Sequence, residues 1–125
     1  MLNQKGLIMV VIPLTMAILG LIGTGALATI EHEKNLAYER DQQRLADISS
    51  VQGKLDDYYL KNSAHPLQKD EATDGWKVLQ SYLDNLPNDP LNSKGWSYAY
   101  WSDSKSYTLR YMQEETMEER VVFGY

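Results

Sequence analysis

Residues 45–66 read LADISSVQGKLDDYYLKNSAHP, a sequence that predicts an amphipathic helix and the point where it ends. Its apolar residues recur at spacings of three and four, the period of one helix face. They are Leu45, Ile48, Val51, Leu55 and either Tyr58 or Tyr59. Pro66 disfavours helical backbone at the residue before it, so we expect the helix to end near Lys61. The apolar stripe needs a partner surface, which the rest of the chain must supply.

The helix is expected to begin well before this stretch, because only Gly53 disfavours helix between Ile30 and Lys61. Residues 31–44 are polar on all sides, so they are expected to stand as a stalk or to pack against other chains. The faces beside the stripe carry charged side chains: Glu39, Arg40, Asp41, Arg44, Asp47, Lys54, Asp56 and Asp57.

Upstream, the run from Leu7 to Ile30 contains no charged side chain. As a helix rising about 1.5 Å per residue it would be roughly 36 Å long, enough to cross a hydrocarbon core of ~30 Å. We therefore predict a transmembrane helix over residues 7–30 that continues as residues 31–61. A cleaved signal peptide stays open as an alternative, because Ala26-Leu27-Ala28 resembles a small-residue cleavage site. The run is longer than the usual apolar region of about 7–15 residues in such peptides.

Charges at the two ends of this run predict its direction in the membrane. Lys5 precedes it, and Glu31 and Glu33 follow it. The positive-inside tendency then places residues 31–125 outside the cytoplasm, with a single pass through the inner or cytoplasmic membrane. Within the run, small residues recur every four positions and are candidates for close helix packing, although small residues are common in membrane helices. They are Gly20, Thr24 and Ala28.

The remaining chain supplies a short helix and a small sheet. Residues 73–85 predict the helix, capped by Thr73 or Asp74. Residues 95–125 alternate apolar and polar side chains and predict antiparallel strands. The expected fold class is α+β, with one long N-terminal helix packed on the short helix and the sheet. The predicted core comprises Leu45, Ile48, Val51, Leu55, Tyr59, Trp76, Leu79, Tyr98, Tyr100, Tyr107 and Leu109.

The amino-acid composition excludes several classes of function and of binding site. The net charge is −5, and an acidic domain does not favour phosphate neutralisation, so we expect no nucleic-acid partner. The chain has no cysteine, which excludes disulfides, thiolate catalysis and cysteine-ligated zinc. His32 and His65 are its only histidines, and neither lies in a metal-binding motif. We expect no enzymatic activity, no catalytic residue and no cofactor.

One acidic segment leaves two readings open. Glu114, Glu115, Glu118 and Glu119 could offer oxygen ligands to calcium. The alternative, which we favour, is a solvated acidic loop that binds no metal.

The order of these features resembles the type IV pilin and type II secretion pseudopilin superfamily over almost the whole chain. Residues 1–6, ending Gln4-Lys5-Gly6, look like the leader that prepilin peptidase removes between Gly6 and Leu7. The apolar helix starts directly after that glycine. The paired tyrosines near the helix end, with His65 where the family usually has tyrosine before Pro66, are similar to the family's pattern. The Pro-x-Asp-Pro turn from Pro87 to Pro90 and the aromatic hairpin after it complete the resemblance.

Two positions depart from the family's pattern. Val11 stands where these families usually carry a glutamate, and Pro13 lies closer to the helix start than their usual proline. Loss of the glutamate is known among tip-type minor members of the superfamily.

The resemblance implies a structural subunit of a type IV pilus-like or type II secretion pseudopilus-like filament, with a minor or tip position. It implies other pilin-like subunits, prepilin peptidase and membrane lipid as partners, methylation at Leu7, and a cell-surface or periplasmic filament. The alternative function is a single-pass membrane protein whose outer domain binds a ligand or partner protein without forming a filament. A third reading is a processed periplasmic or secreted domain, if residues 1–28 are removed as a signal peptide.

Overall fold

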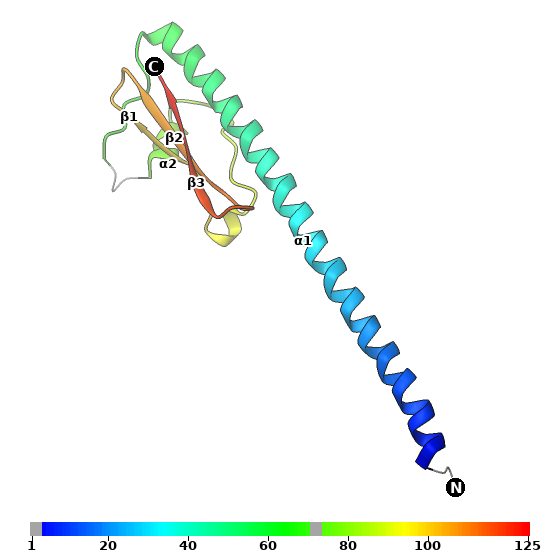
Figure 1. The fold of residues 1–125 in the computed structure, drawn as a ribbon. Helices are drawn as coiled ribbons and strands as arrows, with labels where there is room; N and C mark the ends of the chain where they lie inside the picture. The colour runs from blue at the N-terminus through cyan, green and yellow to red at the C-terminus, as the bar shows by residue number, and fades with distance from the viewer. Residues whose placement is uncertain (1–3, 71–73) are drawn as a thin grey trace. The chain divides into compact units, whose positions relative to one another are not determined.

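The computed structural model describes residues 4–70 and 74–125, and the side chains of 27–70 and 74–125. The chain divides into two units, Met1–Leu36 and Ala37–Tyr125, and each is described by itself. The elements are one long helix, a short helix, one 3₁₀ turn and a three-stranded antiparallel sheet, so the predicted α+β class is confirmed (Figure 1).

Helix α1 runs over Gln4–Asn62, so its residues belong to both units. Every described side chain from Leu27 to Asn35 is exposed, including Leu27 at 64% and Ile30 at 52%. Among the helices of the described chain, none combines the length and the apolar character needed to cross a membrane. The predicted transmembrane segment 7–30 falls outside the described side chains over residues 7–26.

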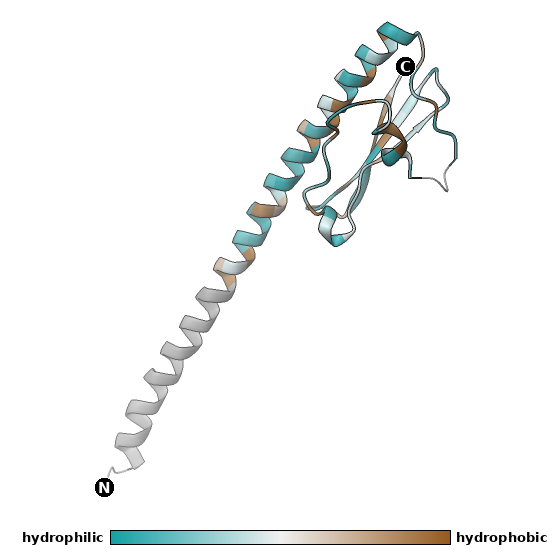
Figure 2. Cartoon of the chain, turned by 180° about the vertical axis from the view of Figure 1, so that it is seen from behind, coloured by the Kyte–Doolittle hydropathy of each residue, from teal (hydrophilic) through white to brown (hydrophobic). Residues whose placement is uncertain are grey.

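In the second unit, α1 contributes one buried face to the domain. Ile48, Val51 and Leu55 are at most 3% exposed and lie on that face. Figure 2 shows hydrophilic colours over most of the described length of α1, interrupted by a few hydrophobic residues. The helix ends where Ser63 takes a left-handed conformation, φ 55°, and its N–H donates to the Tyr59 carbonyl at 2.7 Å. The observed end lies one residue beyond the predicted one.

Helix α2, Gly75–Leu79, is much shorter than the predicted helix over residues 73–85. The Asp74 carboxylate caps it by accepting the N–H groups of Trp76 and Lys77. After Leu79 the chain continues in turns, and Asn85 adopts φ 53°, which a helix cannot contain. Gly75 is required at the start of α2, because a Cβ there would overlap the backbone oxygen of Tyr100.

The sheet has the order β1-β2-β3, with β1 Ala99–Ser102, β2 Tyr107–Gln113 and β3 Glu118–Gly124. Tyr100 pairs with Leu109, and Leu109 with Val122. The 3₁₀ turn η1, Asn92–Lys94, ends at Gly95, whose left-handed conformation (φ 87°) is not that of a strand, and the first strand starts only at Ala99 rather than at the predicted residue 95. β3 begins at Glu118, inside the predicted acidic loop, because a turn with Met117 at φ 55° reverses the chain earlier.

The core lies between the buried face of α1, helix α2 and the inner face of the sheet. It contains Ile48, Val51, Leu55, Trp76, Leu79, Tyr98, Tyr100, Tyr107, Leu109 and Tyr111. The prediction that Leu45 and Tyr59 belong to the core is wrong, because they are 50% and 39% exposed. Leu45 follows the buried Arg44 by one residue and so points about 100° away from the buried face. Tyr59 lies near the helix end, where its ring packs on His65 at 4.8 Å between centroids.

Candidate functional site: a buried charge cluster

Five charged side chains form a cluster where α1, the proline-rich segment of residues 87–90 and the β2–β3 turn meet. They are Arg40, Asp41, Arg44, Asp89 and Glu114. Arg44 is its centre, and its side chain is completely buried. Because an unpaired charge in such a position is strongly destabilising, the partners of Arg44 decide whether this region can fold.

The Arg44 guanidinium contacts three carboxylates. Its Nε and Nη2 donate to both oxygens of Asp89 at 2.7 and 2.9 Å, a bidentate pair. Its Nη1 donates to Asp41 at 2.8 Å and to Glu114 at 3.3 Å. The Trp96 ring covers the guanidinium, with 4.8 Å from Cζ to the ring centroid. Burial lowers the pKa of Arg44, but the three carboxylates outweigh it and raise that pKa, so the side chain stays charged.

Asp41 joins the helix to the backbone of the β2–β3 turn. Its two carboxylate oxygens accept the N–H groups of Glu114 at 2.8 Å and Glu115 at 3.0 Å. Burial raises the pKa of Asp41, but these two hydrogen bonds and Arg44 together hold the pKa below its usual 3.8. The carboxylate therefore acts as a charged anchor for a turn more than 70 residues away in sequence.

Glu114 closes the cluster on its more exposed side. Arg40 donates to both of its oxygens, at 2.8 Å from Nε and 2.6 Å from Nη2. The bond from Arg40 is the main reason that the pKa of Glu114 lies below its usual value. With two cations and three anions, the cluster carries one net negative charge, and every member bonds at least one other member.

The sequence did not predict this cluster, because Asp41 and Arg44 were expected on polar faces, with residues 31–44 as a stalk or packed against other chains. In the structure Asp41 is 3% exposed and Arg44 is fully buried, so the packed part of α1 begins earlier than predicted. A signal was present: Asp41 and Arg44 continue the three-and-four spacing of Ile48, Val51 and Leu55 toward the N-terminus. The spacing shows that Asp41 and Arg44 lie on the buried face of the helix if that face extends so far, but it does not identify their partners.

This arrangement bears on the possible calcium site. Glu114 is held by two arginines, whereas Glu115, Glu118 and Glu119 are exposed. In residues 27–70 and 74–125, no three potential metal-ligating side chains are grouped so that they could hold an ion.

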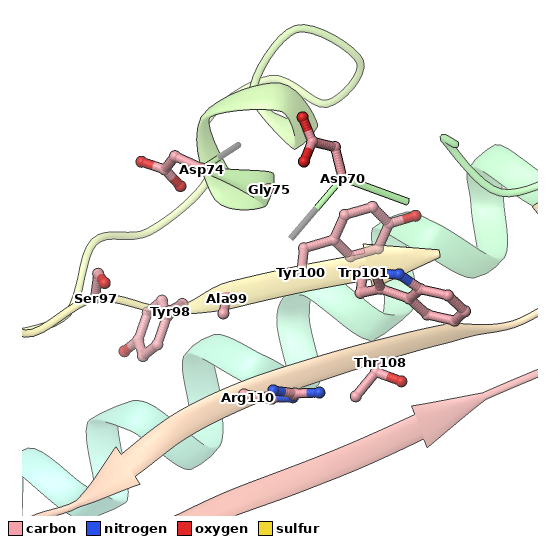
Figure 3. A pocket seen from close by; sticks show the side chains of 10 residues that line it. All are labelled: Asp70, Asp74, Gly75, Ser97, Tyr98, Ala99, Tyr100, Trp101, Thr108 and Arg110. Carbon is pink, nitrogen blue, oxygen red and sulfur yellow. The ribbon is translucent and has the colours of Figure 1, made fainter. Parts of the chain in front are cut away.

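A second feature is an open hollow of about 550 Å³ beside α2. Figure 3 shows Asp70 and Asp74 on the segment leading to α2, and Trp101, Thr108 and Arg110 on strands β1 and β2. The hollow combines two carboxylates, one guanidinium and one indole, a set of groups suited to a polar ligand with an apolar face. The Asp74 carboxylate is already used in capping α2.

The remaining predicted residues are placed as follows. Gly6, Leu7, Gly20 and Thr24 lie outside the described side chains, and Ala28 is exposed. His32 is exposed, and His65 is 3% exposed. The predicted core residues Trp76, Leu79, Tyr98, Tyr100, Tyr107 and Leu109 are buried in the second unit.

Comparisons of the chain with protein-family models, with curated proteins and with solved structures found no match.

Proposed function

We propose that the chain is a structural subunit of a type IV pilus-like or type II secretion pseudopilus-like filament, in a minor or tip position. The supporting observation is the contrast along α1. Leu27 and Ile30 are exposed apolar residues, whereas Asp41, Arg44 and Ile48 pack into the domain. The uncharged helical run of residues 7–30 needs an apolar partner, either lipid or other helices.

Two partners can shelter such a helix in turn: membrane lipid first, and the same helix of neighbouring subunits after assembly. Residues 7–30 carry no charge, so moving them from lipid into a helix bundle exchanges one apolar environment for another. The net hydrophobic cost of that exchange is small, and the helix keeps its backbone hydrogen bonds in both settings. The same property makes subunit storage in a membrane compatible with later assembly.

Val11 supports the minor or tip position. In the resembling families a carboxylate at this place is thought to neutralise the amino terminus of the neighbouring subunit, and an ion pair is much stronger in an apolar bundle than in water. Val11 cannot form that pair. A subunit at the end of a filament has neighbours on one side only, so it tolerates the loss better than a subunit in the middle.

Processing at Gly6 tests the proposal. The full chain is co-expressed with a prepilin peptidase, and the mature N-terminus is determined by mass spectrometry. We expect Leu7 as an N-methylated first residue, and no cleavage in a Gly6→Val variant, because the peptidase reads a small residue there. A wild-type mass unchanged by the peptidase would contradict the proposal, and a start near Thr29 would instead identify a signal peptide.

Cross-linking tests assembly separately from processing. The chain has no cysteine, so Ile30→Cys introduces a single thiol on the exposed part of α1. We expect covalent dimers in cells that assemble filaments. Lys105→Cys, at an exposed turn of the domain, is the matched control and is expected to form few. Equal yields from the two variants would argue against packing through the helix.

The second candidate is a single-pass membrane protein that binds a ligand or partner through its outer domain. The hollow beside α2, with Arg110 and Trp101 on its sheet side, favours it. Arg110→Ala separates the candidates. The binding function is supported if this substitution abolishes the protein's biological function while cross-linking at residue 30 stays normal. The filament is supported if Ile30→Asp abolishes that function and Arg110→Ala does not.

A further inference from the structure

His65 is a buried histidine whose ring has no hydrogen-bond partner. It is 3% exposed, and within the described chain neither Nδ1 nor Nε2 contacts a donor or acceptor. The ring is held by aromatic contacts instead, with Tyr59 and Tyr107 each at 4.8 Å between centroids. A buried ring nitrogen without a partner is costly, and a buried charged ring costs far more, so this site accepts only the neutral form readily.

The ring lies where three segments meet. Tyr59 belongs to the last turns of α1, His65 to the segment after it, and Tyr107 to the start of β2. The backbone closes the same junction. The His65 N–H donates to the Ser104 carbonyl at 2.8 Å, and Gln68 and Ser102 exchange two backbone hydrogen bonds at 3.0 and 2.8 Å. Movement of the ring would therefore loosen the segment from the β1–β2 turn.

Four titratable groups face His65 from the elements packed against it: Asp56 and Tyr59 on α1, Asp103 in the β1–β2 turn, and Tyr107 on β2. Burial lowers the pKa of His65, and the charges of Asp56 and Asp103 only partly oppose it, so the pKa lies below the ordinary 6.5. Burial raises the pKa of Tyr107 above its usual 10, so that phenol stays neutral near neutral pH. The N–H groups of Ser106 and Lys105 hold the pKa of Asp103 below 3.8, so that carboxylate does not titrate in the same range.

We propose that His65 is a proton-sensitive latch, which holds the segment after α1 against the β1–β2 turn while its ring is neutral and releases that segment when the ring is protonated. The closed junction offers an imidazolium no acceptor within the described residues. In the open junction the charged ring reaches water and the neighbouring carboxylates Asp56 and Asp103. Protons therefore favour the open form, and the proposal does not depend on filament assembly.

Hydrogen exchange of three backbone amides tests the latch in the full chain in mild detergent. The reporters are the N–H groups of His65, Gln68 and Ser102, which close the junction. After correction for intrinsic exchange rates, we expect their opening constants to rise by up to about tenfold per pH unit below pH 6.5, the slope for uptake of one proton on opening. Amides paired between β2 and β3 are the internal control and should show no such slope.

Two variants make the test specific. His65→Phe keeps an aromatic ring and removes both nitrogens, so its reporter amides should show no pH dependence between about pH 7 and about pH 5, where carboxylates remain charged. His65→Tyr serves the same purpose if the phenylalanine variant does not fold. An NMR titration should also show the His65 ring taking up its proton below pH 6.5. Three results would overturn the latch: opening constants of the wild-type reporter amides that do not change with pH, the same pH dependence in both variants, or a His65 ring that titrates at or above pH 6.5.

Discussion

The contacts of Arg44 join helix α1, the proline-rich segment and the β2–β3 turn. Arg44 is fully buried, and its three carboxylate partners come from the helix itself, from the proline-rich segment and from the β2–β3 turn. A buried ion pair is weak evidence for net stability relative to apolar packing, but removing one partner leaves the others charged in a largely buried site. We therefore expect the cluster to contribute to the arrangement of these segments rather than to net stability.

Replacing Arg44 with methionine is expected to lower the free energy of unfolding by about 3–5 kcal/mol, because Asp41 and Asp89 then remain buried without their cation. Urea denaturation of the full chain measures the change. The matched control is Arg120→Met, whose side chain is 47% exposed and pairs with Glu118 at 3.6 Å. That pair is expected to contribute less than about 1 kcal/mol. Similar losses in the two variants would show that Arg44 is not in a buried network.

The buried apolar residues beside the charge cluster could be predicted from the sequence better than the buried charged residues of the cluster itself. Ile48, Val51 and Leu55 could be assigned to the core from spacing alone. Arg44 could not, because a charged residue at a stripe position has two readings, solvent exposure or a buried partner. The choice depends on Asp89 and Glu114, whose distance from Arg44 in space is fixed only by the folded chain. His65 was missed for a similar reason, since its burial comes from Tyr59 and Tyr107.

At the scale of the elements, we expect a glycine-to-alanine substitution to change stability in opposite directions in α1 and in α2. Gly53 lies inside α1, nine residues before its end, with open space around its α-carbon, whereas a Cβ on Gly75 would meet the backbone of Tyr100. We expect Gly53→Ala to raise the free energy of unfolding by about 0.5–1 kcal/mol through helix propensity. Gly75→Ala is expected to lower it by about 1–3 kcal/mol through overpacking.

Thermal unfolding followed by circular dichroism measures both changes, and each variant is the control for the other. A loss of stability in Gly53→Ala would mean that its site is in contact with another chain or surface. An unchanged stability in Gly75→Ala would mean that α2 can move away from β1.

Element types were predictable, and element lengths were less so. The spacing of apolar residues indicated the long helix, and alternation indicated the strands. Helix α2 stops at Leu79, although Tyr82 and Leu83 fit its period, because the chain continues there in turns, with the N–H groups of Ser81 and Tyr82 donating to the carbonyls of Val78 and Leu79, three residues back. Local turn conformations of this kind decide where an element ends, and periodicity carries no information about them.

For the molecule as a whole, acid should destabilise the domain in two steps. The folded-state pKa of His65 is below 6.5, so the folded state binds its proton less readily than the unfolded state, and stability falls as the pH drops below 6.5. Asp41 and Glu114 have lowered folded-state pKa values, so their contribution is present above the ordinary 3.8 and 4.5. That contribution is lost as the pH falls through the folded-state values.

The free energy of unfolding, measured by urea denaturation from about pH 7 to about pH 3, should show both steps. His65→Phe should remove the first step and leave the second. Asp41→Asn should weaken the second step while lowering stability at neutral pH, because the amide cannot neutralise Arg44. A single step below pH 4 in the wild-type chain would contradict the role given to His65.

The members of the charge cluster lie far apart in the sequence, so they leave the ribosome at different times during synthesis. Asp89 follows Arg44 by 45 residues, and Glu114 follows it by 70. A ribosome therefore releases Arg44 and its neighbour Asp41 long before the other two carboxylates of the cluster, and long-range contacts of this kind form late in folding. Nascent chains that stop short of the last hairpin cannot close around Arg44, so they remain open to proteases, and only a nearly finished polypeptide gains the protection of a packed interior.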